Sequence, residues 1–406
     1  MGEWKSFQVG EIGKVITGKT PKTSISDNYG GYIPFLTPSD DMSVKYVRKT
    51  AKTLTEKGLS EVKNAILPAN SVCVSCIGSD LGKVVITTRP TVTNQQINSI
   101  VVDEARFDIS FVYYAMRILG KKLNFISKTS TAVPIVNKSS FSSYEIECPP
   151  LKEQKQIAAV LSVLDAKIEC NRMINDNLQQ QLTAIYKSWY QDFSLVNDTE
   201  LVETAYGTIP KGWHYVLLGD LCQSISVTHK FDKNALIFLN TGDVEDGRFL
   251  HSNLMAVKEM PGQAKKTIAP GDILYSEIRP INRHFAYVIF PSDDYVVSTK
   301  LMVIRAKNFD TRRLYHYLTS ENVLNELQLQ AESRSGTFPQ IRFENVSKLP
   351  ILIADEQTES EFVKILHTVF DQIEQLNREN KQLSELRDTL LPKLMSGEID
   401  VSDIQL

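Results

Sequence analysis

The 406-residue sequence predicts an α+β fold in which two similar mixed α/β blocks are separated by a long antiparallel two-helix coiled coil. Apolar residues recur every three and then four positions in two stretches, which begin near residues 153 and 356. The segments before these stretches repeat one another with an offset of about 202 residues. A chain of this length also exceeds what one hydrophobic core usually holds.

Each apolar stretch is expected to be a helix of about 35 residues, or about 50 Å at 1.5 Å per residue. A narrow seam on so long a helix favours pairing with another helix, and the second copy is the obvious partner. Asn175 and Asn380 hold matching positions, and such polar residues fix the alignment of a pair. Arg387 is the one charged residue in the seam. The predicted seam consists of Ile157, Leu161, Leu164, Ile168, Asn175, Leu178 and Leu182, and of Leu366, Val369, Ile373, Leu376, Asn380 and Leu383.

The duplication also predicts the domain boundaries. Trp4 stands six residues before Gly10, and Trp213 stands six before Gly219, so both blocks open alike. Strands of period two, separated by Gly, Pro, Asn and Asp turns, follow in each block. The expected segments are a first block over 1–150, a first helix over 151–193, a linker over 194–212, a second block over 213–353, and a second helix with a tail over 354–406.

Composition narrows the class of protein. Hydrophobic residues make up 42% and charged residues 23%, which is typical of globular proteins. No apolar run is long enough to span a bilayer, and the N-terminus lacks the pattern of a signal peptide. The five cysteines are odd in number and scattered, which favours a reducing, cytoplasmic location.

Charge is distributed unevenly along the chain. The net charge is −3, but residues 1–150 carry 18 Lys and Arg against 13 Asp and Glu. Residues 354–406 carry 5 against 12. Residues 201–353 are nearly balanced, with 17 Lys and Arg against 16 Asp and Glu. This distribution allows DNA contact by the blocks and leaves the helices for protein partners.

A letter-for-letter match to the phosphate-binding loop occurs at residues 13–20. That mechanism needs a helix directly after the loop, whereas Pro21 follows here and Val15 and Ile16 favour a strand. The better interpretation is a turn that offers Lys19 and Lys22 to DNA phosphates. We expect no metal site, because the His and Cys residues lack the spacing of ligands, and no catalytic site.

Polar residues in the predicted loops are the candidates for DNA contacts. Arginine is the commonest reader of guanine, and amide side chains pair with adenine. For each candidate the alternative is simple solvation or a hydrogen bond within its own block. The predicted contacts are Lys19, Thr20, Lys22, Thr37, Ser39, Ser79, Lys83, Gln95 and Gln96 in the first block, and Asn240, Thr241, Arg279, Asn282, Arg283, His284, Lys300 and Arg334 in the second.

Several of these segments together resemble the specificity (S) subunit of type I restriction-modification systems. The resemblance covers essentially the whole chain. It is carried by the stretches at 149–158, 161–171, 174–175, 186–190 and 390–399, and within the blocks by 18–21, 33–40 and 271–280. The second helix departs most, because residues 353–357 lack the Pro-Pro-Leu that precedes the first.

The resemblance implies two target recognition domains that read a bipartite, asymmetric DNA site, with the coiled coil setting the spacer. It implies assembly with two modification subunits, which carry S-adenosylmethionine and methylate adenine, and with restriction subunits that use ATP and Mg. This chain would bind no cofactor and catalyse no step itself.

Two other hypotheses stay open at this point. The chain could be a coiled-coil adaptor whose blocks bind proteins, which weak and salt-insensitive binding in a gel shift would favour. It could also be a nucleotide hydrolase that uses Lys19 and Thr20, which ATP turnover by the purified chain would favour.

Overall fold

The computed structural model describes residues 3–129, 136–196, 199–333 and 339–404, and within them not the side chains of residues 79 and 127–129. It contains two compact units. Unit 1 comprises residues 1–175 and 375–406, and unit 2 comprises residues 176–374. The boundaries of these two units differ from those of the five segments that the duplication predicts. The five segments remain a prediction.

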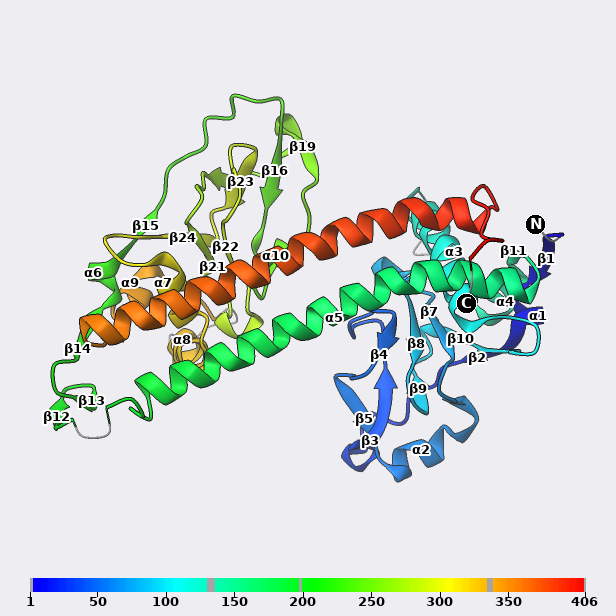
Figure 1. Ribbon diagram of the computed structural model, residues 1–406, viewed down its shortest axis with the longest axis horizontal. Coiled ribbons are helices and arrows are strands. Elements are labelled where there is room, and N and C mark those ends of the chain that lie inside the picture. Colours follow the sequence, from blue (N-terminus) through cyan, green and yellow to red (C-terminus); the bar gives the residue numbers. More distant parts are fainter. Residues whose placement is uncertain (1–2, 130–135, 197–198, 334–338, 405–406) are drawn as a thin grey trace. The chain divides into compact units, whose positions relative to one another are not determined.

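Two helices of 40 residues each run through both units (Figure 1): α5 (Leu151–Tyr190) and α10 (Glu356–Met395). Both consist largely of unbranched, helix-favouring residues. They pack together within each unit. In unit 1, residues early in α5 meet residues late in α10, so the pairing is antiparallel, as predicted.

Asparagine pairs fix this alignment inside unit 1. The Nδ2 atom of Asn171 donates to Oδ1 of Asn380 at 3.0 Å, and Nδ2 of Asn175 donates to Oδ1 of Asn377 at 2.9 Å. The seam asparagines therefore meet polar partners, as expected. Asn175 and Asn380 do not pair with each other, however, and Asn377 lies outside the predicted seam.

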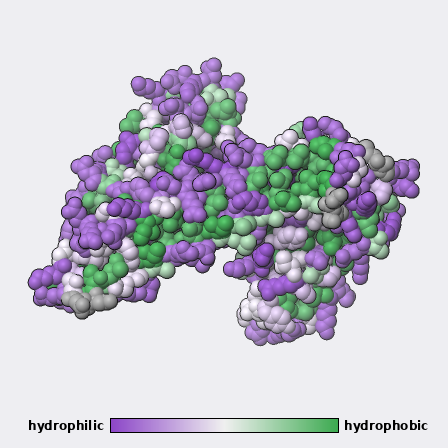
Figure 2. Space-filling view, in the orientation of Figure 1, coloured by the Kyte–Doolittle hydropathy of each residue, from purple (hydrophilic) through white to green (hydrophobic). Residues whose placement is uncertain are grey.

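The apolar seam is only partly shielded, as befits a two-helix pair. Figure 2 shows apolar side chains in the strip between α5 and α10, with hydrophilic side chains on their outer sides. Fully burying one such aliphatic side chain contributes about 1.5–3 kcal/mol. The buried members of the predicted seam are Ile157, Leu161, Ile168, Asn175, Leu182 and Leu366. The half-buried members are Leu164, Leu178, Val369, Ile373, Leu376, Asn380 and Leu383.

Arg387, the charged residue of the seam, has a structural explanation. Its Nη1 donates to Oδ1 of Asp165 on α5 at 2.7 Å, and its Nε donates to Asp388 at 3.0 Å. The hydroxyl of Tyr114 donates to the other oxygen of Asp165 at 2.5 Å. Tyr114 belongs to α3 (Ile109–Thr129), so this network joins three helices of unit 1.

Unit 1 contains two mixed sheets beside a two-stranded pair. Helix α3 packs on the larger sheet, where alternating residues such as Val72, Val74 and Ile86 form the core with Phe111 and Tyr114. The larger sheet has the order β2 (Gly13–Thr17), β10 (Ile97–Val102), β7 (Val72–Ser75), β8 (Val84–Thr87), β4 (Tyr46–Val47). The smaller has the order β5 (Lys52–Leu54), β3 (Tyr29–Leu36), β9 (Thr91–Thr93), β6 (Ile66–Leu67), and β1 (Lys5–Gln8) pairs with β11 (Glu145–Cys148). The short helices are α1 (Val9–Ile12), α2 (Glu56–Glu61) and α4 (Lys138–Ser143).

Unit 2 repeats this plan. Its larger helices outside the long pair are α7 (Thr311–Leu318) and α8 (Glu321–Ser333), and its short helices are α6 (Leu218–Leu221) and α9 (Phe343–Ser347). One sheet has the order β15 (Cys222–Ile225), β24 (Leu301–Ala306), β21 (Ile273–Ser276), β22 (Phe285–Tyr287). The other has the order β19 (Leu254–Ala256), β16 (Ala235–Leu239), β23 (Tyr295–Ser298), β20 (Ala264–Lys266). The remaining pairs are β14 (His214–Leu217) with β25 (Pro350–Ile353) and β17 (Val244–Glu245) with β18 (Arg248–Phe249).

The segment predicted as a linker contains a hairpin, β12 (Leu201–Thr204) with β13 (Gly207–Pro210). Its Ile209 is buried against Trp213 and Leu182 in unit 2. In unit 1 the C-terminal tail plays a similar part, because Val401 joins the core and Nε2 of Gln156 donates to the carbonyl of Ile404 at 2.8 Å. The sequence analysis predicted neither contact.

A buried arginine anchors α7 to the long helices in unit 2. Arg313 is 0% exposed, and its Nε donates to Oε1 of Glu359 on α10 at 2.9 Å. Its guanidinium carbon lies 4.5 Å from the ring centre of Tyr190 on α5. One turn further along α7, His316 packs against the rings of Tyr186 and Phe362.

His316 makes the stability of this contact depend on pH. Burial, and to a smaller extent Arg313, lowers its pKa from the usual 6.5 to about 3. Protonation therefore favours the unfolded chain, so the contribution is complete above about pH 6.5 and is lost as the pH falls toward 3. Between pH 7 and pH 5 we expect the free energy of unfolding to fall by about 1–2 kcal/mol more in the wild type than in His316→Phe.

Chemical denaturation of both chains at the two pH values measures this difference. The exposed His214 supplies the control, because His214→Phe should keep the full acid sensitivity of the wild type. Equal acid sensitivity in the His316→Phe chain would contradict the assignment.

Candidate nucleic-acid interface

Loops gather at one edge of the sheets in each unit. We define loop A as the residues after β3 and its counterpart β16, loop B as those after β7 and β21, and loop C as those before β10 and β24. Loop D follows β2. Their residues are A1 37–40, B1 76–83, C1 94–96 and D1 18–22 in unit 1, and A2 240–243, B2 277–284 and C2 299–300 in unit 2.

Loop A is closed in the same way in both units. The Asp40 carboxylate accepts a hydrogen bond from the backbone N of Thr37 at 2.7 Å, and the Asp243 carboxylate accepts one from the backbone N of Asn240 at 2.7 Å. An aspartate that bonds a backbone N–H nearby fixes such a turn. The two turns therefore share one backbone conformation although their other side chains differ.

Loops B and C are joined by an equivalent bond in each unit. The backbone N of Cys76 donates to the carbonyl of Gln96 at 2.8 Å, and that of Glu277 donates to the carbonyl of Lys300 at 3.0 Å. Loop D adds to this face in unit 1, where the backbone N of Lys19 donates to the carbonyl of Thr93 at 2.8 Å. We call the surface that these loops form in each unit its loop face.

Loop B carries left-handed backbone at two matching positions. Gly78 and Gly82 have φ of 68° and 87°, and Arg279 and Arg283 at the corresponding positions have φ of 43° and 57°. Glycine adopts this conformation without strain, whereas other L-residues pay about 1 kcal/mol or more. Unit 2 thus has two arginines in a strained backbone conformation where unit 1 has two glycines, which adopt it without strain. Backbone strain of this kind is concentrated at functional sites.

Several predicted contacts of unit 1 are exposed on its loop face. Lys19, Lys22, Ser39 and Gln95 are exposed, and Thr20 is half-buried. The Thr20 hydroxyl donates to Oε1 of Gln95 at 2.6 Å, which ties D1 to C1.

Other predicted contacts of unit 1 have partners within the loops. The Thr37 hydroxyl bonds Asp40, and Oε1 of Gln96 accepts from Asn94 at 3.0 Å. Lys83 is paired with Asp80 at 2.6 Å and lines a cavity. The side chain of Ser79 lies outside the described residues.

In unit 2 the predicted contacts divide into presented and anchored residues. Arg279 and Asn282 are exposed on B2. Arg283 is anchored instead, because its guanidinium bonds Asp246 at 2.9 Å and Glu321 at 2.6 Å. This arrangement makes Arg283 a support for the loop.

The remaining predicted contacts of unit 2 are also partly engaged. Nδ1 of His284 lies 2.9 Å from the carbonyl of Val244. Nζ of Lys300 is 3.2 Å from Oε1 of Gln340. Asn240 caps the turn of A2 through the backbone N of Thr241 at 2.9 Å. Arg334 lies outside the described residues.

The phosphate-loop letters at residues 13–20 do not form a phosphate loop. Gly13–Thr17 is strand β2, which pairs with β10, and no helix follows it directly. The strand that Val15 and Ile16 favoured is therefore present. This geometry leaves Lys19 and Thr20 on the loop face.

Sequence reasoning overlooked the aspartates that shape loop A. Asp40 and Asp243 stand 203 residues apart and each follows a leucine by four positions, so the duplication carried this signal. It also overlooked Asp246, which lies between strands β17 and β18 and whose carboxylate forms an ion pair with Arg283. Within the described ranges no group of three or more His, Cys, Asp or Glu side chains could hold a metal ion. No helix among the residues described is long and apolar enough to cross a membrane.

Comparison with known proteins now identifies the class. The family described as type I restriction modification DNA specificity domain matches residues 1–180 and 210–385. The chain therefore belongs to this family and contains two such regions, in agreement with the duplication and the resemblance found in the sequence.

Named relatives agree with this assignment. The HindI specificity subunit of Haemophilus influenzae is 43% identical over 183 residues, which are 44% of this chain and 39% of that protein. The MjaIX specificity subunit of Methanocaldococcus jannaschii is 25% identical over 418 residues, covering 99% of this chain and 95% of that protein. The crystal structure of an S subunit from M. genitalium matches with a TM-score of 0.52 and 16% identity over 97% of this chain and 96% of that one, which supports the fold.

The left-handed backbone conformation of Arg279 and its predicted contact with DNA can be tested by mutation. Arg279→Gly should raise the free energy of unfolding by about 0.5–1 kcal/mol, because glycine relieves the strain. The same change should weaken binding of the recognised duplex by about tenfold, since a guanidinium paired with guanine contributes about 1–3 kcal/mol.

Arg279→Ala is the matched variant, which loses the guanidinium but keeps the strain. It should weaken binding equally without the gain in stability. Denaturation and fluorescence anisotropy with labelled duplex measure the two quantities. Unchanged DNA affinity in both variants would remove Arg279 from the interface.

Proposed function

We propose that this chain is the non-catalytic DNA-reading subunit of a type I restriction-modification complex, in which each loop face reads one half of a bipartite, asymmetric site. The observation that carries the proposal is the shared loop framework. Loops A, B and C are bonded alike in both units, yet matching positions present different side chains. Equal frameworks with unlike side chains suit two different base sequences.

The side chains of the two loop faces suit the recognition of different base sequences. B1 has Gly78 and Gly82 where B2 has the exposed Arg279 and the anchored Arg283, so the two loops differ in charge as well as in reach. Exposed Lys19 and Lys22 add cations to the face of unit 1, which suits phosphate contacts. Base sequence would then be read by Gln95 and Arg279, whose side chains match adenine and guanine edges.

The long helices support the proposed partners. Apolar side chains stay exposed on them, including Val163 at 68% and Met173 at 49% on α5 and Leu386 at 47% on α10. Exposed apolar residues that lie outside the seam suit contact with other proteins. We propose that two modification subunits bind here and supply S-adenosylmethionine and methyl transfer, and that restriction subunits supply ATP- and Mg-dependent steps. The specificity chain itself would supply no cofactor for these steps and would act in the cytoplasm.

Exchange of one block tests the reading assignment. Replacing residues 1–150 with the corresponding block of another specificity subunit should change one half of the methylated site and leave the other half as before. Methylome sequencing of cells with the wild-type and the exchanged chain reads both halves directly.

The reciprocal exchange of residues 213–353 is the control and should change the other half. A change in both halves after either exchange would contradict the assignment of one half to each face. An unaltered site after both exchanges, together with weak and salt-insensitive binding in gel shifts, would favour the adaptor hypothesis.

A further inference from the structure

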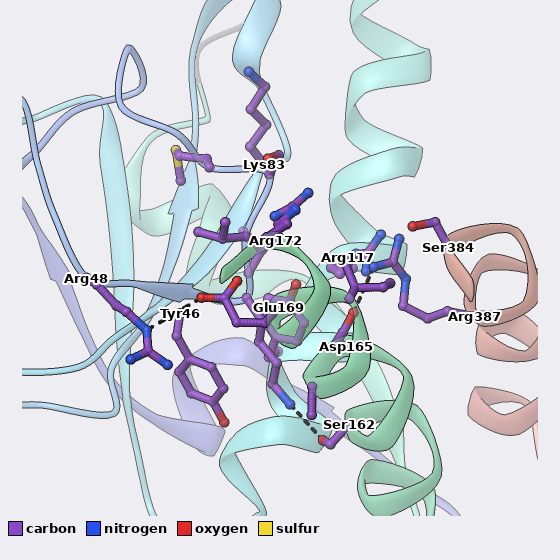
Figure 3. Close-up of a pocket in the computed structure, with 18 of the residues that line it drawn as sticks. Tyr46, Arg48, Lys83, Arg117, Ser162, Asp165, Glu169, Arg172, Ser384 and Arg387 are labelled. Carbon is purple, nitrogen blue, oxygen red and sulfur yellow. Dashed lines mark hydrogen bonds and ion pairs between the residues drawn. The ribbon is translucent and has the colours of Figure 1, made fainter. Parts of the chain in front are cut away.

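A cavity of about 720 Å³ lies in unit 1, and Gly82 and Lys83 at the end of B1 form part of its lining. Figure 3 shows side chains from several elements directed toward it, among them Arg117, Arg172 and Arg387. Its walls come from the segment around β4, the end of B1, α3, α5 and α10. The volume falls within the range of small-molecule sites, which is about 300–1,000 Å³.

Cationic side chains dominate the lining. Seven of them face two carboxylates, those of Asp165 and Glu169. Such an excess of one sign within a concave site attracts ligands of the opposite sign. The cationic residues are Lys45, Arg48, Lys83, Arg117, Lys121, Arg172 and Arg387.

Carboxylates behind the lining offset only part of this charge. Asp388 is shared by three of the cations, Arg117 at 3.2 Å, Lys121 at 3.1 Å and Arg387 at 3.0 Å. Lys83 is paired with Asp80. Four carboxylates thus stand against seven cations, so an excess of three positive charges remains around the cavity.

Lys45 forms a buried cationic group beside this space. It is 7% exposed, and its Nζ donates to the hydroxyls of Ser162 at 2.7 Å, Ser110 at 3.0 Å and Tyr114 at 3.4 Å. These partners are uncharged, and a buried charge without a bonded counter-ion is costly. Burial lowers the Lys45 pKa to about 8, against the opposing effect of Asp165, so the ammonium form still prevails at neutral pH.

Arg172 is the second cation that lacks a counter-ion. It is half-buried in the lining, and within the described part of the chain its guanidinium makes no hydrogen bond or ion pair. Arg48 is held only loosely, at 3.6 Å from Glu169. A guanidinium presents a planar fork of donors that suits phosphate oxygens.

We propose that this cavity binds the phosphate groups of a nucleotide, with Arg172 as the main cationic ligand and with the charge of Lys45 adding to the attraction. The half-exposed ring of Tyr46 at the rim offers a surface on which a base stacks. A phosphate could come from a free nucleoside polyphosphate or from the backbone of bound DNA. The site goes beyond the proposed reading function, since the proposed contacts Lys19, Lys22, Gln95 and Arg279 do not line the cavity.

Isothermal titration of the full chain tests the site. Inorganic tripolyphosphate and ATP should both bind saturably, whereas uncharged adenosine should not. Arg172→Gln should lower the affinity for tripolyphosphate at least about tenfold, since a hydrogen bond between charged groups is strong. Lys57→Gln is the matched control, because Lys57 is an exposed lysine of unit 1 outside the cavity, and it should leave the affinity unchanged.

Circular dichroism and thermal melting confirm that each variant is folded, and Arg172→Ala provides a second variant. A competition arm separates the two sources of phosphate. Displacement of tripolyphosphate by the recognised duplex, with weaker duplex binding in Arg172→Gln, assigns the site to the DNA backbone. Retention of tripolyphosphate beside bound duplex assigns it to a free nucleotide.

Absence of saturable binding by tripolyphosphate and ATP would overturn the proposal. An equal loss of affinity in the Lys57 variant would overturn it too, because the binding would then reflect general charge attraction. Neither result bears on DNA reading by the loop faces, which block exchange tests separately.

Discussion

Pairing of α5 with α10 is the constraint on which both units depend. The pair is aligned by polar contacts as much as by its apolar seam. Asn171 bonds Asn380 and Asn175 bonds Asn377, and a slip of one turn would take these partners away from the buried amides of Asn171 and Asn175. An unpaired buried polar group costs about 1–3 kcal/mol, so these contacts disfavour other alignments. An arginine also forms an ion pair with one of the long helices in each unit. Arg387 pairs with Asp165 in unit 1, and Arg313 pairs with Glu359 in unit 2.

The same arrangement of loops occurs in both units. Asp40 and Asp243 close the same turn, and the same backbone bond joins loops B and C in each unit. Because the framework depends on backbone atoms and one aspartate, the other loop positions are free to change. This separation between a fixed scaffold and variable side chains explains how two similar blocks can serve two different base sequences. The strained arginines of B2 show that one unit tolerates a less stable loop.

The periodic and repeated features were readable from the sequence. Strict spacing of apolar residues predicted the helices, and the offset of about 202 residues predicted the duplicated blocks, because both are patterns of residue type that need no knowledge of side-chain contacts. The bond of Arg387 to Asp165 and the role of Gln156 were not readable, since they depend on residues more than 200 positions away. For the candidate interface, the loops could be predicted but their side chains only in part. Arg283 and Arg279 look alike in sequence, and only the positions of Asp246 and Glu321 show that Arg283 is anchored.

If the helix pair sets the distance between two DNA-reading faces, its length must appear in the recognised site. Inserting one heptad after Asn175 and a matching heptad before Leu376 lengthens both helices by about 10 Å, which corresponds to about three base pairs. Methylome sequencing should then show both half-sites unchanged and the spacer between them longer by about three base pairs, while a heptad in only one helix should abolish modification. Methylation at the original spacing by the doubly extended chain would contradict the account.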